Sequence, residues 1–324
     1  MIALGGNAIV GPGEEGNLAQ QYANTTRTMR EIARLVKIWP DGRLVITHGN
    51  GPQVGNILLR SEEASHRIYP LTLDVCVSDS EGGMGYMIQQ ILNNELAALG
   101  FGDRDVVTII TQTVVDPHDP AFADPSKFIG QAYSAERAEA LRRERGWTMK
   151  EDKGRGWRRV VASPEPRRVV EARVVERLLK DGVIVIAAGG GGIPVAERSD
   201  GRLFGVECVV DKDLAAALLA RAVGLDTFVI LTGVERVCLN FGTPQQEPLA
   251  RLTVSEARAH LAAGQFPPGS MGPKIEACAR FLEGGGRRAV ICAPGSLQAA
   301  LRGETGTEIV ADGPESGEPR KPAD

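Results

Sequence analysis

Residues 44–55 read LVITHGNGPQVG, an apolar run that passes into a glycine-rich turn at His48. The run Leu44–Thr47 has the length and the β-branched content of a buried strand. Glycine lets backbone N–H groups approach a phosphate without an intervening Cβ, so the turn is a candidate anion site. One such turn is weak support, because glycine after a strand often marks only a tight connection to a helix.

The same arrangement occurs twice more in the chain. Ile2–Leu4 precedes Gly5-Gly6-Asn7, and Val183–Ala188 precedes Gly189–Gly192. Other strands are predicted at Val106–Thr111, Thr227–Leu231 and Ala289–Cys292, and helices around Tyr22 to Val36, at Met84–Leu99, at Val169–Leu179 and at Leu214–Val223. This alternation predicts an α/β protein with a mainly parallel sheet. Ligands bind beyond the carboxyl ends of such strands, so we expect the three turns to form one site.

Composition narrows the class of protein. The chain has 324 residues, of which 43% are hydrophobic, and a net charge of -4. That allows a large core and argues against a nucleic-acid binder, which usually carries a basic excess. No apolar run approaches the roughly 20 residues that span a bilayer, and no signal peptide is recognisable at Met1. The five cysteines lie far apart without a C-x-x-C motif, which indicates reduced thiols, no cysteine-based metal site and a cytoplasmic location.

Two segments interrupt the alternation. Residues from about 116 to 166 are rich in proline, tryptophan and charge, and are expected to protrude from a domain that spans residues 1–310. Between Arg142 and Arg173 there are eleven basic and five acidic residues, interpreted mostly as a solvated face. An RNA-binding role would need more interleaved aromatic residues than Trp147 and Trp157. Residues 311–324 are polar and rich in proline and glycine, so a disordered tail is expected there.

Several common catalytic motifs are absent. The sequence has no G-x-x-x-x-G-K-[ST], no G-x-S-x-G and no H-E-x-x-H, and its G-x-G-x-x-G at residues 11–16 does not directly follow the first strand. The usual P-loop, dehydrogenase, hydrolase and metalloprotease interpretations therefore do not apply.

Three lysines are candidates for binding phosphate. Lys212 lies between Asp211 and Asp213, one of which is the expected N-cap of an apolar helix. Lys274 follows a glycine- and proline-rich loop that opens another helix, and Lys127 lies in the protruding segment. Each one alone could be a solvent-exposed lysine, but three beside glycine turns favour contacts with phosphate.

Segments along nearly the whole chain resemble the carbamate kinases of the amino acid kinase family. They include LGGNAI (4–9), ITHGNGPQVG (46–55), PSKFIG (125–130), IAAGGGGIPV (186–195), VVDKDLAAALLA (209–220), LTGVERV (231–237) and GSMGPKIEA (269–277). The resemblance implies the amino acid kinase fold. This is a three-layer αβα sandwich with a mostly parallel sheet of about eight strands and a small protruding subdomain. It also implies a homodimer.

The implied reaction is reversible phosphoryl transfer between ATP and carbamate, giving ADP and carbamoyl phosphate. It would serve arginine or carbamoyl phosphate catabolism with ATP formation, with Mg2+ carried by the nucleotide. Two alternatives stay open. One is a related enzyme that phosphorylates a different small carboxylate or phosphate acceptor, and the other is a non-catalytic nucleotide-binding homologue.

The resemblance also implies roles for individual residues. Catalytic roles fall on Asn7, Lys127, Lys212, Asp213 and Lys274; phosphate binding on Gly5, Gly6, Gly190 and Gly191; carbamate binding on Gly49, Asn50 and Gly51; and nucleotide binding on Thr232, Gly233, Val234, Met271 and Lys274. His48 is interpreted as structural rather than as a base. The segment Ser78–Gly83 departs from the family's usual pattern, and so does Phe128. The first departure is expected to affect dimer packing or the fit of the acceptor.

Overall fold

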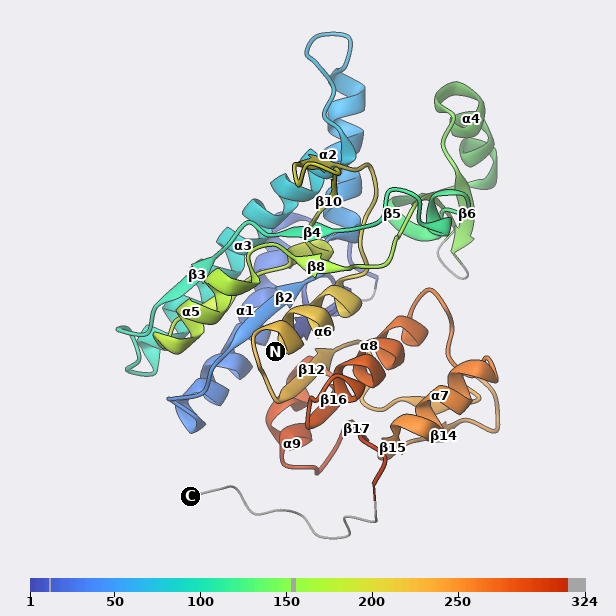
Figure 1. Cartoon of the computed structure of the whole chain (residues 1–324). Helices are drawn as coiled ribbons and strands as arrows, with labels where there is room; N and C mark the ends of the chain where they lie inside the picture. Colours follow the sequence, from blue (N-terminus) through green and yellow to red (C-terminus); the bar gives the residue numbers. More distant parts are fainter. Residues whose placement is uncertain (12, 153–155, 314–324) are drawn as a thin grey trace.

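The computed structural model describes residues 1–11, 13–152 and 156–313 and contains one large central sheet (Figure 1). Its eight strands run in the order β15-β17-β16-β12-β1-β2-β9-β3. Their bounds are β1 (Ile2–Leu4), β2 (Val45–His48), β3 (Val106–Thr108), β9 (Ile184–Ile186), β12 (Thr227–Leu231), β15 (Arg251–Thr253), β16 (Arg288–Cys292) and β17 (Thr307–Val310). Neighbouring strands pair in parallel, except that β16 and β17 are antiparallel. The predicted α/β class with a mostly parallel sheet is confirmed.

Alternating side chains of the strands face two helical layers. Ile2, Leu4 and Ile46 lie in a core with α1 (Leu18–Ile38), α3 (Leu73–Ala98) and α9 (Leu297–Leu301). Ala3 and Val45 face the other way, toward α5 (Ala172–Lys180), α6 (Lys212–Ala222), α7 (Val254–Ala262) and α8 (Met271–Glu283). Because successive strand residues point to opposite faces, this pattern produces the three expected layers.

Some boundaries differ from the predictions. The expected strand Val106–Thr111 ends at Thr108, and the chain then enters a second sheet at β4 (Gln112–Val114). That sheet also contains β8 (Arg168–Val169), β10 (Ile193–Glu197) and β11 (Leu203–Gly205). Helix α3 begins at Leu73 rather than Met84, and α6 begins at Lys212 with Asp211 as its N-cap. A short hairpin of β13 (Cys238–Leu239) and β14 (Glu247–Pro248) follows β12.

A three-stranded sheet with one helix stands away from the central sheet (Figure 1). It consists of β5 (Lys127–Tyr133), α4 (Ala135–Arg145), β6 (Met149–Asp152) and β7 (Gly156–Val161). This protruding part rests on α2 (Gly51–Ala64), where a Cβ added to Gly55 would overlap the backbone of Gly130. Glu62 of α2 also forms ion pairs with Arg145 (3.2 Å) and Arg159 (2.8 Å).

Several arginines of the Arg142–Arg173 segment have structural contacts rather than solvent around them. Arg158 is buried, pairs with Asp152 at 3.0 Å and donates to the carbonyl of Gly130. Arg145 and Arg159 both stack on the ring of Trp147. The interpretation as a solvated face holds for Arg143, Arg167, Arg168 and Arg173, which are exposed. Arg142, Arg145, Arg158 and Arg159 instead hold the protruding part together, which composition alone does not reveal.

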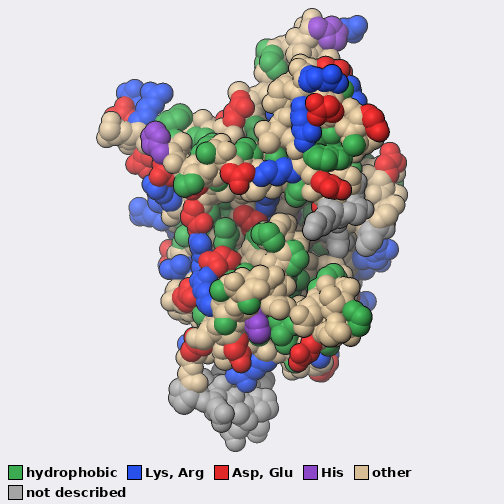
Figure 2. Space-filling view, turned by 90° about the vertical axis from the view of Figure 1, so that its right-hand side faces the viewer, with side chains coloured by type: hydrophobic (Ala, Val, Ile, Leu, Met, Phe, Trp, Pro, Cys, Tyr) green, Lys and Arg blue, Asp and Glu red, His purple; other side chains and the backbone are tan. Residues whose placement is uncertain are grey.

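Lys/Arg and Asp/Glu side chains are interspersed over the face seen in Figure 2, so this face has no extended patch of one sign. Among the described residues, no helix combines the length and the hydropathy needed to cross a membrane. The expected tail, residues 311–324, lies outside the described residues from position 314 onward.

Candidate active site

The first two glycine turns meet at the carboxyl edge of the central sheet. The N–H of Gly5 donates to the carbonyl of Leu231 at the end of β12 (2.7 Å), and the N–H of Gly49 donates to the carbonyl of Leu4 (3.1 Å). A Cβ on Gly5 would overlap that Leu231 carbonyl. Glycine at position 5 therefore allows the turn to sit tightly between the ends of β1 and β12.

The third turn packs against the second. Gly190, Gly191 and Gly192 all have positive φ angles (64°, 98° and 83°), a region that only glycine adopts readily. A Cβ on Gly190 would collide with the side chain of Asn50. The turns at Gly49–Gly51 and Gly189–Gly192 thus form one surface, with Asn50 between them.

Three lysines gather around two carboxylates beside these turns. The Lys212 Nζ pairs with Asp213, and the Lys274 Nζ lies 3.2 Å from Asp213 Oδ2. The Lys127 Nζ lies 2.6 Å from Asp211 Oδ2. Lys212 also packs its aliphatic stem 3.3 Å from where a Gly49 Cβ would lie, which places it next to the second turn.

Burial and mutual attraction set the charge of this cluster. Burial lowers the pKa of Lys212, although Asp213 opposes the change. Burial favours the neutral form of Lys274 as well. The charges of Asp213 and Asp211 outweigh this effect of burial, so the pKa of Lys274 is raised. Burial favours neutral carboxyls, yet the lysines hold the pKa values of Asp211 and Asp213 below their usual range. Three ammonium groups against two carboxylates leave an excess of positive charge suited to binding anions.

His48 lies beneath the second turn and is 1% exposed. Its Nδ1 lies 3.2 Å from the carbonyl oxygen of Gly49, and burial lowers its pKa to about 4. The imidazole is therefore neutral at neutral pH and enclosed, which suits a structural role better than proton transfer.

The remaining candidate residues differ in their surroundings. Thr232 donates its N–H to the carbonyl of Cys292 (2.8 Å) and lies against Gly5, whereas Gly233 is exposed and Val234 half-buried. Met271, the first residue of α8, packs against the apolar core, while Lys274 one turn later reaches the carboxylates. Gly6 and Asn7 lie in a 3-10 turn after β1, and the side chain of Asn7 is outside the part that the structure describes.

Sequence reasoning missed two contacts of this site. Asp211 was expected only as a possible helix cap, and it does accept from the N–H groups of Asp213 (2.9 Å) and Leu214 (3.3 Å). Its other oxygen binds Lys127, a partner 84 residues away that no local pattern indicates. Ser80 of α3 accepts a hydrogen bond from Asn50 Nδ2 (2.9 Å), so the unusual Ser78–Gly83 segment touches a candidate acceptor residue.

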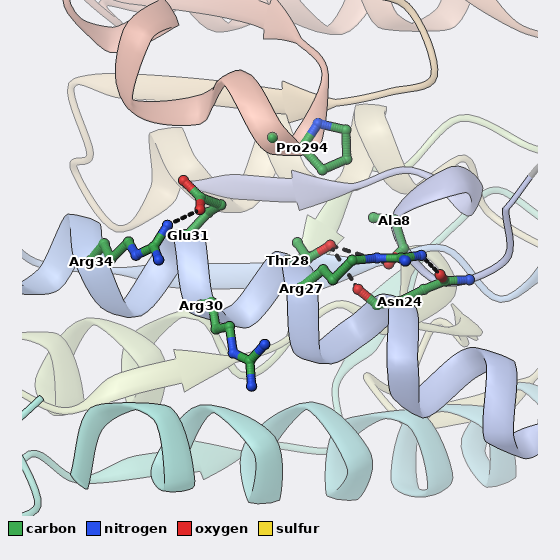
Figure 3. Close-up of a pocket in the computed structure, with 9 residues that line it drawn as sticks. Ala8, Asn24, Arg27, Thr28, Arg30, Glu31, Arg34 and Pro294 are labelled. Atoms are coloured by element: carbon green, nitrogen blue, oxygen red, sulfur yellow. Dashed lines mark hydrogen bonds and ion pairs between the residues drawn. The ribbon is translucent and has the colours of Figure 1, made fainter. Parts of the chain in front are cut away.

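A hollow of about 410 Å³ lies elsewhere, beside α1 (Figure 3). Its arginines already have partners: Arg27 donates to Asn24, Arg34 pairs with Glu31, and Arg30 pairs with Glu95. The hollow touches Ala8 but none of the three clustered lysines. The charged cluster at the sheet edge is therefore the candidate active site.

The fold is that of an α/β protein with a cluster of charged side chains at the carboxyl edge of a parallel sheet, which is where such proteins bind their ligands. Residues 1–293 match the model of the amino acid kinase family, and the chain belongs to that family.

Its relatives are similar over almost their whole lengths. The carbamate kinase of Pyrococcus furiosus is 48% identical, with 96% of this chain and 98% of that protein covered. A carbamate kinase-like protein of Escherichia coli is also 48% identical, over 96% of this chain and 98% of that protein. The solved structure of carbamate kinase from Giardia lamblia bound to AMP-PNP is 39% identical, covers 96% of this chain and 98% of that one, and superposes with a TM-score of 0.86.

Proposed function

We propose that this chain is a carbamate kinase, which transfers a phosphoryl group reversibly between ATP and carbamate and so interconverts carbamate with carbamoyl phosphate. The observation that carries the proposal is the convergence of Lys127, Lys212 and Lys274 on Asp211 and Asp213 beside the glycine turns. Full-length similarity to carbamate kinases supports the choice of acceptor.

The reaction needs no catalytic base. Carbamate is already an anion, so its oxygen attacks the phosphorus without losing a proton. The protein must hold two anions in line and neutralise charge as it spreads over the phosphoryl oxygens. Buried lysines and backbone N–H groups do both, because their charges and dipoles are fixed before the substrates arrive.

Each group has a distinct task in this proposal. Lys212 contacts the transferring phosphoryl group, and Asp213 orients both Lys212 and Lys274. Lys274 steadies the nucleotide phosphates, while Lys127 approaches the acceptor from the protruding part. The phosphoryl group lies on Gly5, Gly6, Asn7, Gly190 and Gly191; the carbamoyl group on Gly49, Asn50 and Gly51; and the nucleotide along Thr232, Gly233, Val234 and Met271.

A magnesium ion would arrive at this site with the nucleotide rather than be held by the protein's own carboxylates. Mg2+ is usually held by one or two carboxylates together with phosphates and water. Both carboxylates of the cluster, Asp211 and Asp213, are already engaged by lysines. The ion would therefore be held mainly by the nucleotide phosphates, whose charge it would neutralise.

A cytoplasmic homodimer completes the proposal. The five cysteines are free thiols, which suits a reducing compartment. Tyr86 of α3 is 59% exposed and Ile110 after the edge strand β3 is 45% exposed. Exposed apolar side chains beside the edge strand of a sheet favour association with a second copy. Light scattering of the purified chain measures this directly, and a concentration-independent monomer would contradict it.

The acceptor is tested with a panel. The chain is incubated with ATP, Mg2+ and one acceptor at a time: carbamate from ammonia and bicarbonate, acetate, or acetylglutamate, with ADP release as the readout. We expect release with carbamate far above the others. Faster release with another acceptor would assign the chain to a different activity within the family.

A further inference from the structure

Glu81 lies in the first half of α3 and packs against the Gly189–Gly192 turn. It is 2% exposed. Its Oε2 accepts a hydrogen bond from the N–H of Thr111 (3.0 Å), while its Oε1 has no hydrogen-bond partner within the described residues. An ionised carboxylate in that position would leave a buried charge poorly compensated, which is costly.

The surroundings of Glu81 connect it to the third glycine turn. A methyl group on Gly189 would collide with both the imidazole of His48 and the Glu81 side chain, so these three residues pack against one another. Thr111, which donates its N–H to Glu81, also accepts at its Oγ1 from the N–H of Ala188 (3.0 Å). Glu81 thus supports the start of the Gly189–Gly192 turn through Thr111.

The residue before Glu81 supports the second turn. Ser80 accepts from Asn50 Nδ2 (2.9 Å) and donates to the carbonyl of Val77 (2.7 Å). One turn of α3 therefore contacts both Asn50 and the Ala188–Gly189 segment. A shift of this part of α3 would change the spacing between the turn proposed to hold the carbamoyl group and the turn proposed to hold the phosphoryl group.

Among the residues that the structure describes, no cation around Glu81 is free to balance a negative charge there. His48 on β2 is neutral, since burial lowers its pKa to about 4. Glu171, at the start of α5, adds repulsion, and Lys212 on α6 is paired with Asp213. Burial, with the smaller effect of Glu171, raises the pKa of Glu81 to about 8 against the opposing N–H groups of Thr111 and Gly189.

We propose that Glu81 is a positioning residue for the carbamoyl end of the site and acts there as a neutral carboxylic acid. The inference rests on the proposed function, because it concerns the acceptor of that reaction. Ionisation of Glu81 would place an unbalanced negative charge beneath the turns that receive an anion. It would thereby weaken binding of carbamoyl phosphate while leaving the nucleotide end unchanged.

The test compares wild type, Glu81→Gln and Asp79→Asn. Glutamine has the shape of the neutral acid but cannot ionise. Asp79→Asn makes the same chemical change at an exposed position on the same helix and serves as the control. The KM for carbamoyl phosphate and the KM for ADP are measured from pH 6 to pH 9 in the ATP-forming direction. Each KM is compared as a ratio between two variants, because titration of the substrates affects both variants equally and cancels.

For carbamoyl phosphate, we expect the ratio of the wild-type KM to the Glu81→Gln KM to be near one at pH 6. It should rise about tenfold by pH 9, where only about a tenth of the carboxyl stays neutral. The ratio for ADP should stay flat, and Asp79→Asn should follow the wild type. Parallel pH profiles in wild type and Glu81→Gln would overturn the inference alone. Absence of turnover in the wild type at pH 6 would overturn the proposed function and the inference with it.

Discussion

The ammonium of Lys127 lies 2.6 Å from the carboxylate of Asp211, and this contact joins the protruding part to the first turn of α6. The Lys127 side chain is 30% exposed, more than the 11% of Lys212 and the 15% of Lys274. Lys127 is therefore the least enclosed of the three clustered cations, and its element rests on α2 rather than on the central sheet. An acceptor anion can compete with Asp211 for it.

Replacing Lys127 with alanine tests this arrangement. We expect turnover to fall and the KM for carbamoyl phosphate to rise, because the lysine contacts the acceptor, while ADP affinity changes little. Steady-state kinetics with each substrate varied, together with calorimetry of ADP binding, measure both effects. Equal losses of ADP affinity and turnover would place Lys127 at the nucleotide instead.

Gly55→Ala tests how the protruding part is positioned. The added methyl group overlaps the backbone of Gly130, which cannot yield as a flexible side chain would. We expect displacement of β5 and, with it, a loss of turnover that resembles the Lys127→Ala variant. Gly83→Ala is a suitable control, since a Cβ there meets no neighbouring atom. If Gly55→Ala has normal kinetics, the contact with α2 does not position Lys127.

The sequence predicted the strands and turns better than the long-range contacts. Strand β12 has the bounds expected from its apolar run, and the glycine turns follow β1, β2 and β9 as expected. The sequence predicted a helix that begins at Met84, whereas α3 begins at Leu73. The earlier residues were missed because Gly82 and Gly83 lower the helix propensity of that segment. Gly85 is required there by packing, since a Cβ would overlap the side chain of Thr108 on β3.

The cluster itself could be only partly predicted. Three lysines beside glycine turns were visible as candidates, but the sharing of Asp213 by Lys212 and Lys274 spans 61 residues. The buried position of Glu81 depends on the packing of α3 against Thr111 and Gly189, contacts that no local pattern contains. A charged residue in a glycine-rich segment is otherwise typical of a surface.

Glu81→Gln should stabilise the folded chain as the pH rises. The pKa of Glu81 in the folded chain is about 8, above the ordinary 4.5, so its contribution to stability is present below pH 4.5 and is lost as the pH rises to 8. Glutamine has no such loss. We expect the difference in unfolding free energy, variant minus wild type, to grow between pH 5 and pH 8 by up to about 1.4 kcal/mol per pH unit. Denaturant melts across this range measure it, and a constant difference would show that Glu81 is ionised.

The C-terminal segment should be dispensable beyond Gly313. Residues 314–324 are polar and rich in proline, and such a composition buries little. Removing them should leave the melting temperature and turnover unchanged. A chain that ends at Val310 also loses Asp312, whose carboxylate accepts from the N–H of Ser255 (3.0 Å) at the start of α7, so a small drop in melting temperature is expected. If the chain that ends at Gly313 has a lower melting temperature than the full chain, residues 314–324 dock on the domain.

ATP formation from carbamoyl phosphate and ADP with Mg2+, followed in a coupled assay, tests the central claim most directly. The measurement compares wild type, Lys212→Ala and Lys180→Ala. Lys180 is an exposed lysine that pairs with Glu176 on its own helix. We expect steady ATP formation by wild type and Lys180→Ala, and a loss on the order of 100-fold or more in Lys212→Ala, with its circular dichroism spectrum unchanged. No ATP formation by the wild type, or near-normal turnover in folded Lys212→Ala, would contradict the account.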